Sequence, residues 1–250
     1  MRYFITLSYD GTRYHGWQIQ PNGISVQGEI ERGLRLLLRR EVGITGAGRT
    51  DAGVHARMMV AHFDLDAPLP ESMDERQLTY KLNKLLPHDI AISQIEPVSN
   101  ELHARFSATS RTYHYYIHTR KSPFEQHYSC MIPYQLDFTL MNEAAQVLME
   151  YEDFGAFCKS HTDVKTTLCH VTQAKWHQTS ASTWYFEITA NRFLRNMVRA
   201  VVGTLIEVGR GRLTIDDFRR VIEGKRRSDA GESMPGHALF LEKIEYCNDD

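Results

Sequence analysis

Residues 44–56 of the chain read ITGAGRTDAGVHA, a segment in which glycines surround one arginine and one aspartate, Arg49 and Asp51. Glycine has no Cβ, so it allows a positive φ and lets another backbone come close. A loop of this kind can hold the short Asp51 carboxylate rigidly at the floor of a cleft. A lone aspartate is more often a turn or cap residue, so the loop alone leaves both interpretations open.

The spacing of this segment differs from that of the known phosphate-binding loops. Its third glycine is misplaced for a dinucleotide fingerprint, and the segment opens no helix inside a βαβ unit. No G-K-[ST] sequence follows, as a P-loop requires. Asp51 and His55 are four residues apart, but in a loop this spacing defines no common face, which argues against a metal site. A catalytic role for Asp51 is the interpretation that remains.

The residues on either side of the loop predict strand, helix, strand, strand, helix, strand. Ser25 is expected to cap the first helix, and Ser72 with Glu75 resembles a capping box for the second. The glycine segment then connects the two middle strands. From hydrophobic periodicity we expect strands at 3–9, just before the glycine segment, at 58–65 and at 90–98, and helices at 25–40 and 72–86.

The second half of the chain repeats this order. We expect a long strand at 103–118, a helix at 138–149, a hairpin of 166–178 with 183–190, helices at 193–208 and 215–222, and a strand at 238–246. Two β-α-β-β-α-β units predict an α+β fold of two ferredoxin-like subdomains, packed around an extended mixed or antiparallel sheet with a central catalytic cleft. The expected subdomains are residues 1–102, which carry the catalytic loop, and residues 103–250.

Composition is that of a globular protein, with 42% hydrophobic and 24% charged residues in 250. The N-terminus does not have the pattern of a signal peptide. The most apolar helical stretch, 197–208, is interrupted by Arg199 and Glu207, which argues against a membrane span. The four cysteines are scattered without a C-x-x-C pair, so we expect reduced thiols rather than a zinc site or disulfides. They are Cys130, Cys158, Cys169 and Cys247.

Positive charge is concentrated near the end of the chain, although the formal net charge is only −2. Residues 191–228 contain ten arginines and lysines against four acidic residues. A local basic surface can bind phosphates even when the total charge is near zero. The alternative is a set of solvated helix faces, and the sequence leaves both open.

Taken together, the motifs resemble those of the TruA-type tRNA pseudouridine synthases. GRTDAGVHA at 48–56 is similar to the catalytic loop of that family, and the residues at 9–18 with 26–27 resemble its opening block. The residues at 103–113 resemble its second motif and those at 191–205 its third. The resemblance spans nearly the whole chain in the family's order. Leu102 and Ala238 stand where the family often has phenylalanine and glycine, which affects local packing and not the charged residues.

This resemblance implies a cytoplasmic enzyme that isomerises uridine to pseudouridine in the tRNA anticodon stem-loop, at positions 38, 39 and 40. It implies a homodimer with no metal, no organic cofactor and no membrane association. Asp51 would be the nucleophile, attacking either the ribose or C6 of uracil. Arg199 would be its cationic partner, Arg49 would help displace the base, and Tyr113 would lie against the uracil. The residues expected to contact RNA are His103, Ala104, Arg105, Phe106, Lys159, Ser160 and His161.

Other interpretations of the same residues remain open. Tyr113 alternates with Tyr115 and Ile117 as in a strand, which equally fits simple core packing. Arg199 is alternatively one more basic surface residue, although its apolar neighbours indicate a charge that needs a partner. For the whole protein the alternatives are an RNA-binding module without catalysis and a hydrolase of small nucleotides. A carboxylate at the centre of a phosphate-binding site argues against the first.

Overall fold

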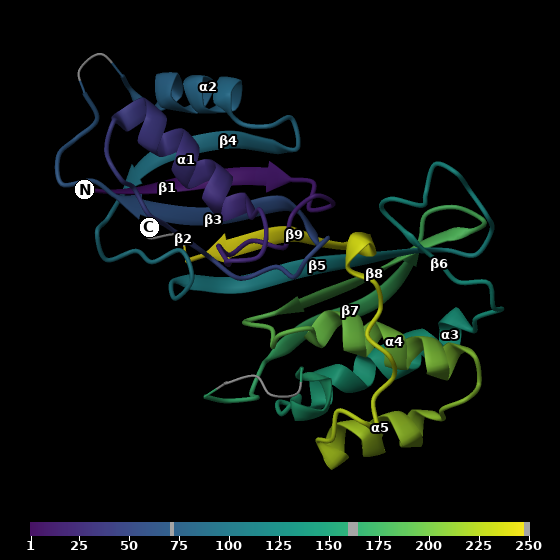
Figure 1. The fold of residues 1–250 in the computed structure, drawn as a ribbon. Coiled ribbons are helices and arrows are strands. Elements are labelled where there is room, and N and C mark those ends of the chain that lie inside the picture. The colour runs from purple at the N-terminus through teal and green to yellow at the C-terminus, as the bar shows by residue number, and fades with distance from the viewer. Residues whose placement is uncertain (71–72, 160–164, 248–250) are drawn as a thin grey trace. The chain divides into compact units, whose positions relative to one another are not determined.

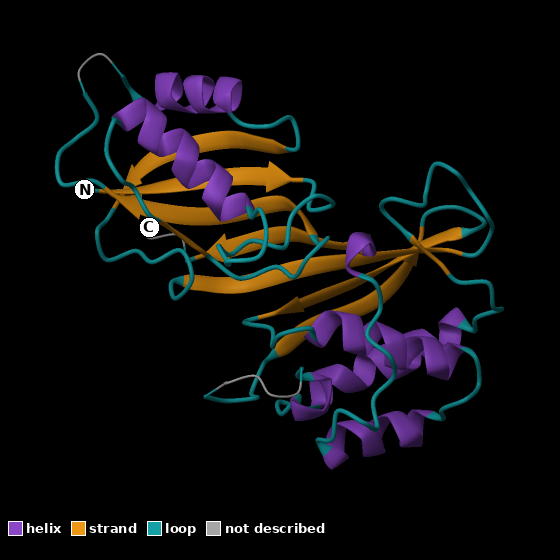
Figure 2. Ribbon diagram, in the orientation of Figure 1, coloured by secondary structure: helices purple, strands orange, loops and turns teal. Residues whose placement is uncertain are grey.

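The computed structural model describes residues 1–70, 73–159 and 165–247 of the 250-residue chain (Figure 1). Within these residues the chain forms nine β-strands and five α-helices, so the predicted α+β class is confirmed (Figure 2). Strand pairing is mixed, since most neighbouring strands are antiparallel but two pairs are parallel. The chain divides into two compact units, Met1–Thr109 with Phe240–Asp250, and Ser110–Leu239.

The first unit contains the predicted β-α-β-β-α-β order. Strand β1 (Arg2–Tyr9) pairs antiparallel with β3 (His55–Asp64) on one side and with β4 (Ile90–Val98) on the other. The short β2 (Ile44–Gly46) pairs with the far end of β3. Helices α1 (Val26–Leu38) and α2 (Glu75–Leu85) contact each other and lie against this sheet (Figure 1).

The C-terminal strand belongs to this first unit. Strand β9 (Leu239–Tyr246) pairs in parallel with β3, so that Phe240 lies opposite His55. Thr109 Oγ1 also donates a hydrogen bond of 3.1 Å to the carbonyl of Glu245. The sequence placed one boundary between residues 102 and 103, whereas the observed first unit combines residues from both ends of the chain. A long-range pairing of this kind leaves no local signal in the sequence.

The helix ends of the first unit follow from local chemistry. Ser25 Oγ accepts a hydrogen bond from the Gly28 amide at 3.2 Å, which confirms it as the N-cap of α1. The helix ends earlier than expected because Arg39 adopts a left-handed conformation with φ of 53°. For α2 the N-cap is Asp74, which accepts from the Gln77 amide at 2.7 Å. The predicted capping box is therefore wrong in its position; Ser72 itself lies outside the described residues.

The second unit is built on β5 (Ala108–His118), which pairs antiparallel with β8 (Thr183–Ala190), and β8 in turn with β7 (Val171–Gln178). The two-residue β6 (Cys130–Met131) is parallel to β5. Helices α3 (Phe138–Val147), α4 (Met197–Gly209) and α5 (Ile215–Gly224) complete the unit. Short 3-10 turns lie at Leu148–Glu150, Gly155–Phe157 and Gly236–Ala238.

Two elements expected in this half are shorter than predicted. The long strand begins only at Ala108, because residues 103–107 form a turn in which the Ser107 amide donates to the carbonyl of His103 at 2.9 Å. Helix α4 begins at Met197 and not at residue 193, because Asn196 has a φ of 67° that an α-helix excludes. Residues 103–107 and 193–196, which the sequence had placed inside regular elements, are therefore turns or irregular segments.

All four cysteines are free, and three of them are buried. Burial raises the pKa of the Cys169 thiol to about 11, so this thiol stays protonated at neutral pH. Across the part of the chain that the structure describes, no helix has the length and apolar character needed to cross a membrane.

Candidate active site and RNA-contact residues

The glycine segment forms the loop between β2 and β3, and Asp51 lies in that loop. The side chain of Asp51 is half-buried, whereas Arg49 is exposed. The loop begins where the Ala47 amide donates to the carbonyl of Val60 at 2.8 Å. It closes where the Val54 amide donates to the carbonyl of Asp51 at 3.2 Å. Asp51 therefore lies in a tight turn that leads directly into β3.

Residues 9–17, which begin with the last residue of β1, are packed against this loop. We call them the opening segment. Its Trp17 amide donates to the carbonyl of Thr50 at 3.2 Å, and the Gly53 amide donates to the carbonyl of Tyr14 at 3.3 Å. The residue before Asp51 and the residue two positions after it are thus both bonded to the opening segment.

Close backbone approach explains two glycines of the opening segment. A Cβ on Gly11 would lie 2.0 Å from the carbonyl oxygen of Val54, and one on Gly16 would lie 2.3 Å from that of Thr50. Gly16 also has a φ of 94°, which side chains rarely adopt. In the loop itself, Gly53 has a φ of 75°, whereas a Cβ on Gly48 would meet nothing within 4 Å. Close backbone approach is therefore found at Gly11 and Gly16 and not at Gly48.

The predicted RNA-contact residues 103–106 form a turn that presents a cation and an aromatic ring. His103 Nδ1 accepts hydrogen bonds from the amides of Arg105 at 3.0 Å and Phe106 at 3.3 Å. The Phe106 side chain is 78% exposed, and the Arg105 guanidinium lies 5.7 Å from its ring centroid. Ala104 is fully buried and anchors the turn. The sequence did not predict this conformation, and contact of these residues with RNA stays a prediction.

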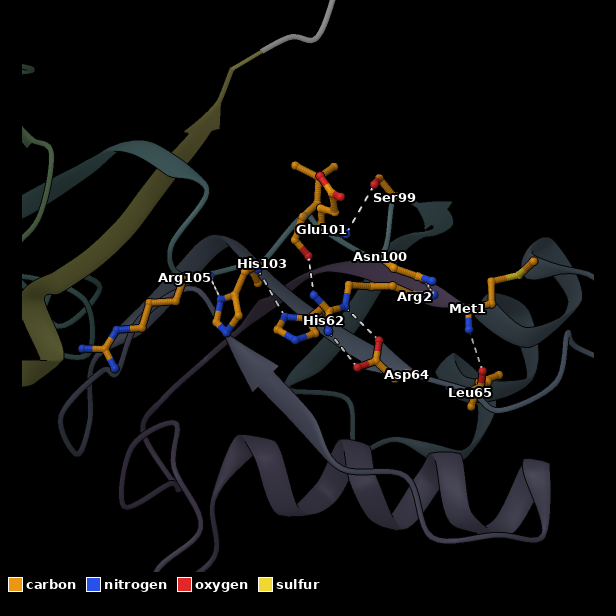
Figure 3. A network of polar contacts seen from close by, with 12 residues as sticks. Met1, Arg2, His62, Asp64, Leu65, Ser99, Asn100, Glu101, His103 and Arg105 are labelled. Atoms are coloured by element: carbon orange, nitrogen blue, oxygen red, sulfur yellow. Dashed lines mark hydrogen bonds and ion pairs between the residues drawn. The ribbon is translucent and has the colours of Figure 1, made fainter.

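Two side chains from neighbouring strands hold this turn in place (Figure 3). His62 Nδ1 accepts a hydrogen bond from the Ala104 amide at 3.2 Å. Arg2 Nη1 donates to the carbonyl of Leu102 at 2.8 Å, while the same guanidinium makes two 2.8 Å contacts with Asp64. Burial, aided by the charge of Arg2, lowers the pKa of His62 to about 4. His62 is therefore neutral at pH 7, as its role as an acceptor requires.

In the second unit, Tyr113 and Arg199 are both half-buried. The edge of the Tyr113 ring meets the Phe193 ring, with centroids 5.2 Å apart. Arg199 lies in the first turn of α4, and its Nε donates to the carbonyl of Met234, whose amide donates back to the carbonyl of Arg199 at 3.1 Å. Arg199 is thus anchored to a neighbouring segment and is not a freely solvated surface residue.

Lys159 is exposed, and its amide donates to the carbonyl of Arg195 at 3.1 Å. Ser160 and His161, also expected to contact RNA, lie outside the described residues. The structure brings Arg49, Asp51 and residues 103–106 into the first unit and assigns Tyr113, Lys159 and Arg199 to the second. A common site for Asp51, Arg199 and Tyr113 stays a prediction.

Much of the basic run at 191–228 is neutralised by ion pairs inside the second unit. Arg210 and Arg212 share Glu207, at 2.9 and 3.3 Å. Other pairs join Arg219 to Glu150, Lys225 to Asp153, at 2.7 Å, and Arg226 to Asp229, at 2.8 Å. Glu150 and Asp153 lie outside the run, so counting charge within the run overstated the positive charge available for phosphates. No group of three or more His, Cys, Asp or Glu side chains within the described residues is arranged to hold a metal ion.

Known proteins are similar to this chain over nearly its whole length. A family model described as tRNA pseudouridine synthase matches residues 5–107 and 144–247. The tRNA pseudouridine synthase A of Parabacteroides distasonis is 58% identical over 245 residues, which cover 98% of this chain and 96% of that protein. The protein of that name from Bacteroides fragilis is 56% identical over the same shares of both chains. The one from Bacillus subtilis is 39% identical, covering 99% of this chain and all of that protein.

The family model places the chain among the tRNA pseudouridine synthases, the class of isomerases that act on tRNA. The long, full-length similarity to relatives of one type is more specific, and the chain belongs to the TruA family of these enzymes. The motifs at 48–56 and 191–205 fall inside the matched residues, whereas the motif at 103–113 is matched only as far as residue 107.

Proposed function

We propose that this isomerase converts uridine to pseudouridine in the tRNA anticodon stem-loop, at positions 38, 39 and 40, with Asp51 as the nucleophile. The observation that carries this proposal is the placement of Asp51. Its carboxylate lies on a loop whose backbone is bonded to the opening segment at residue 50 and at residue 53. A nucleophile must be held in one geometry relative to its target, and these bonds provide that constraint.

The reaction requires only one nucleophilic carboxylate. The N1–C1′ bond breaks, the uracil turns, and C5 bonds to C1′; the C5 hydrogen leaves as a proton and N1 gains one. No electrons are gained or lost overall, so no redox cofactor is needed. We also propose, as the resemblance to the family implies, that no metal takes part. Uracil is a better leaving group than a sugar alkoxide, so the second carboxylate of a glycosidase is unnecessary. Attack of Asp51 on C1′ and attack on C6 both satisfy this scheme.

Three further side chains complete the proposed site. The guanidinium of Arg199 stabilises the ionised form of the nucleophile, since an opposite charge nearby favours a carboxylate. The target base must leave its stack to be reached, and exposed Arg49 enters the space that it vacates. The ring of Tyr113 lies against the uracil. The anchoring of Arg199 to Met234 supports a fixed position for its charge.

The turn at 103–106 is proposed to contact the RNA outside the reacting base. An exposed ring beside a guanidinium suits stacking on an unpaired base together with phosphate binding. Lys159, Ser160 and His161 are proposed as further contacts. We also propose that the enzyme acts as a cytoplasmic homodimer, as the similarity to its family implies.

The test uses unmodified tRNA transcribed with tritium at uracil C5. Incubation with the protein should release tritium to water from the anticodon-stem uridines, because C5 becomes the glycosidic carbon. Asp51→Asn should abolish release while RNA binding is retained. Full release by Asp51→Asn would remove this residue from the mechanism. Binding without any release by the parent protein would favour the non-catalytic RNA-binding module.

A further inference from the structure

We propose that the buried hydroxyl pair of Tyr9 and Thr50 sets the orientation of the Asp51 carboxylate, so that these two are positioning residues for the reaction. This inference rests on the proposed role of Asp51 as nucleophile. Tyr9 Oη and Thr50 Oγ1 lie 2.8 Å apart. Tyr9 is 4% and Thr50 is 8% exposed, so the bond between them is shielded from water.

Thr50 immediately precedes Asp51 and is held at two points. Its hydroxyl bonds to Tyr9, and its carbonyl accepts from the Trp17 amide at 3.2 Å. A β-branched side chain has a stiff χ1, so fixing the hydroxyl also fixes the backbone that carries it. The peptide bond that leads into Asp51 consequently has one orientation.

The position of Tyr9 is itself well defined. It is the last residue of β1 and lies opposite Ala56 at the start of β3, after a shift in register between Leu7 and Tyr9. Its ring packs at 6.1 Å from that of Trp17, which is only 3% exposed. The Tyr9 hydroxyl is therefore positioned next to Thr50 by a strand and a packed ring, which are both rigid elements.

A second anchor lies on the other side of the nucleophile. The Gly53 amide donates to the carbonyl of Tyr14, and the Tyr14 hydroxyl donates to Asp89 at 2.6 Å. Asp51 thus lies between two residues, Thr50 and Gly53, whose backbones are fixed by hydrogen bonds. The Tyr9 hydroxyl is the only side-chain group described here that bonds to the Thr50 hydroxyl, so its removal tests the first anchor without altering the second.

Removal of the bond should lower the rate of the chemical step and leave substrate binding intact. For Tyr9→Phe and for Thr50→Val we expect kcat for tritium release to fall about tenfold, since a small misplacement of a reacting group costs up to about a hundredfold. We expect KM for tRNA to stay within about twofold, because neither hydroxyl is proposed to touch RNA. Thr50→Ser, which restores a hydroxyl, should recover most of the loss seen in Thr50→Val.

The two hydroxyls should behave as one unit. The kcat of the double variant Tyr9→Phe/Thr50→Val should then lie within about twofold of the kcat of either single variant. The effects of groups that act together are strongly non-additive. Tyr3→Phe provides the matched control. Tyr3 is a buried tyrosine on the same strand, and its hydroxyl points to the sulfur of Met1 at 2.9 Å, away from the loop. Its loss should leave kcat unchanged.

Thermal unfolding of every variant separates positioning from loss of folded protein, with rates compared at a temperature where all variants are folded. The inference is overturned if Tyr9→Phe keeps its kcat, if the change falls on KM alone, or if the double variant loses the product of the two single effects. Should Tyr9→Phe fail to fold, the Thr50→Val and Thr50→Ser pair decides by the same criteria. The Asp51→Asn variant distinguishes failure of this inference from failure of the proposed function. If Asp51→Asn is active, Asp51 is not the nucleophile, whatever the result for Tyr9→Phe.

Discussion

Tyr113 and Phe193 meet edge to face, with ring centroids 5.2 Å apart and ring planes at 87°. This is a favoured aromatic geometry, because the positive edge of one ring faces the negative face of the other. Tyr113 belongs to β5, whereas Phe193 lies in the segment between β8 and α4. The ring proposed to lie against the uracil is therefore contacted on one side by Phe193. The sequence had predicted Phe193 to be the first residue of a helix at 193–208, whereas it lies before the helix.

Phe193→Leu should remove the edge-to-face contact of the Tyr113 ring and slow the reaction. We expect the free energy of unfolding to fall by about 1 kcal/mol and kcat for tritium release to fall about threefold or more. Phe138→Leu is the control, since Phe138 stacks on Trp184 at 3.7 Å in the same unit and is assigned no role in catalysis. A similar loss of stability without any loss of kcat in Phe193→Leu would contradict the holding role.

Phe106→Ala should weaken tRNA binding by about 1–3 kcal/mol, the usual contribution of a base stacked on an aromatic ring. Equilibrium binding to tRNA at fixed salt measures this loss. Phe124→Ala is a suitable comparison, because Phe124 is 89% exposed and is assigned no RNA contact. Equal affinities of the two variants would show that exposure of a ring, and not the turn at 103–106, determines the effect.

Gly16→Ala should both destabilise the protein and reduce kcat. The new Cβ would lie 2.3 Å from the carbonyl of Thr50, at a φ of 94°, so the loop that carries Asp51 must shift. Gly211→Ala isolates the backbone contribution, because Gly211 has a φ of 70° with no atom within 4 Å of the added Cβ. We expect Gly211→Ala to lower the free energy of unfolding by about 1 kcal/mol and to keep full activity. Gly16→Ala should lower the free energy of unfolding by more than this and should also lower kcat. Urea unfolding and tritium release measure the two effects.

The lowered pKa of His62, about 4, predicts how stability depends on pH. The unfolded chain binds this proton with a pKa of about 6.5, so the native state is the one that resists protonation. The contribution of His62 is therefore fully present above about pH 6.5 and is lost as the pH falls toward 4. Burial lowers the pKa values of His103 and His118 as well, so they act in the same direction.

His62→Asn keeps an acceptor for the Ala104 amide but cannot take up a proton. We expect its loss of stability between pH 7 and pH 5, measured by urea unfolding, to be smaller than that of the parent. His88→Asn, at an exposed histidine, should behave like the parent. An unchanged pH dependence in His62→Asn would show that other groups govern the acid limb.

Patterns within a few residues of one another predicted most of the fold. The alternation in 3–9 and 183–190 and the Ser25 cap identified elements that the structure confirms. The errors came from local features that hydrophobic periodicity does not reveal. Asn196 has a left-handed φ, which prevents the helix from starting earlier. His103 Nδ1 accepts the Arg105 amide in a turn where a strand was expected.

The site was predicted unevenly for a related reason. The loop at 48–56 is recognisable because its chemistry is local. Its supports are not: Tyr9 and Thr50 are 41 positions apart in sequence, and Arg2 reaches the carbonyl of Leu102 across 100. Such pairs have no spacing rule, so the sequence offered candidate reacting groups, which stay predictions, but not the residues that hold their loop.

The pairing of β9 with β3 also has a consequence for how the protein is made. The N-terminal unit receives one of its strands from residues that follow the whole second unit in the chain. It therefore stays incomplete until residues 110–239 have been synthesised. The edge of β3 next to the loop that carries Asp51 gains its β9 neighbour only after that point, so this region is finished later than the rest of the N-terminal unit.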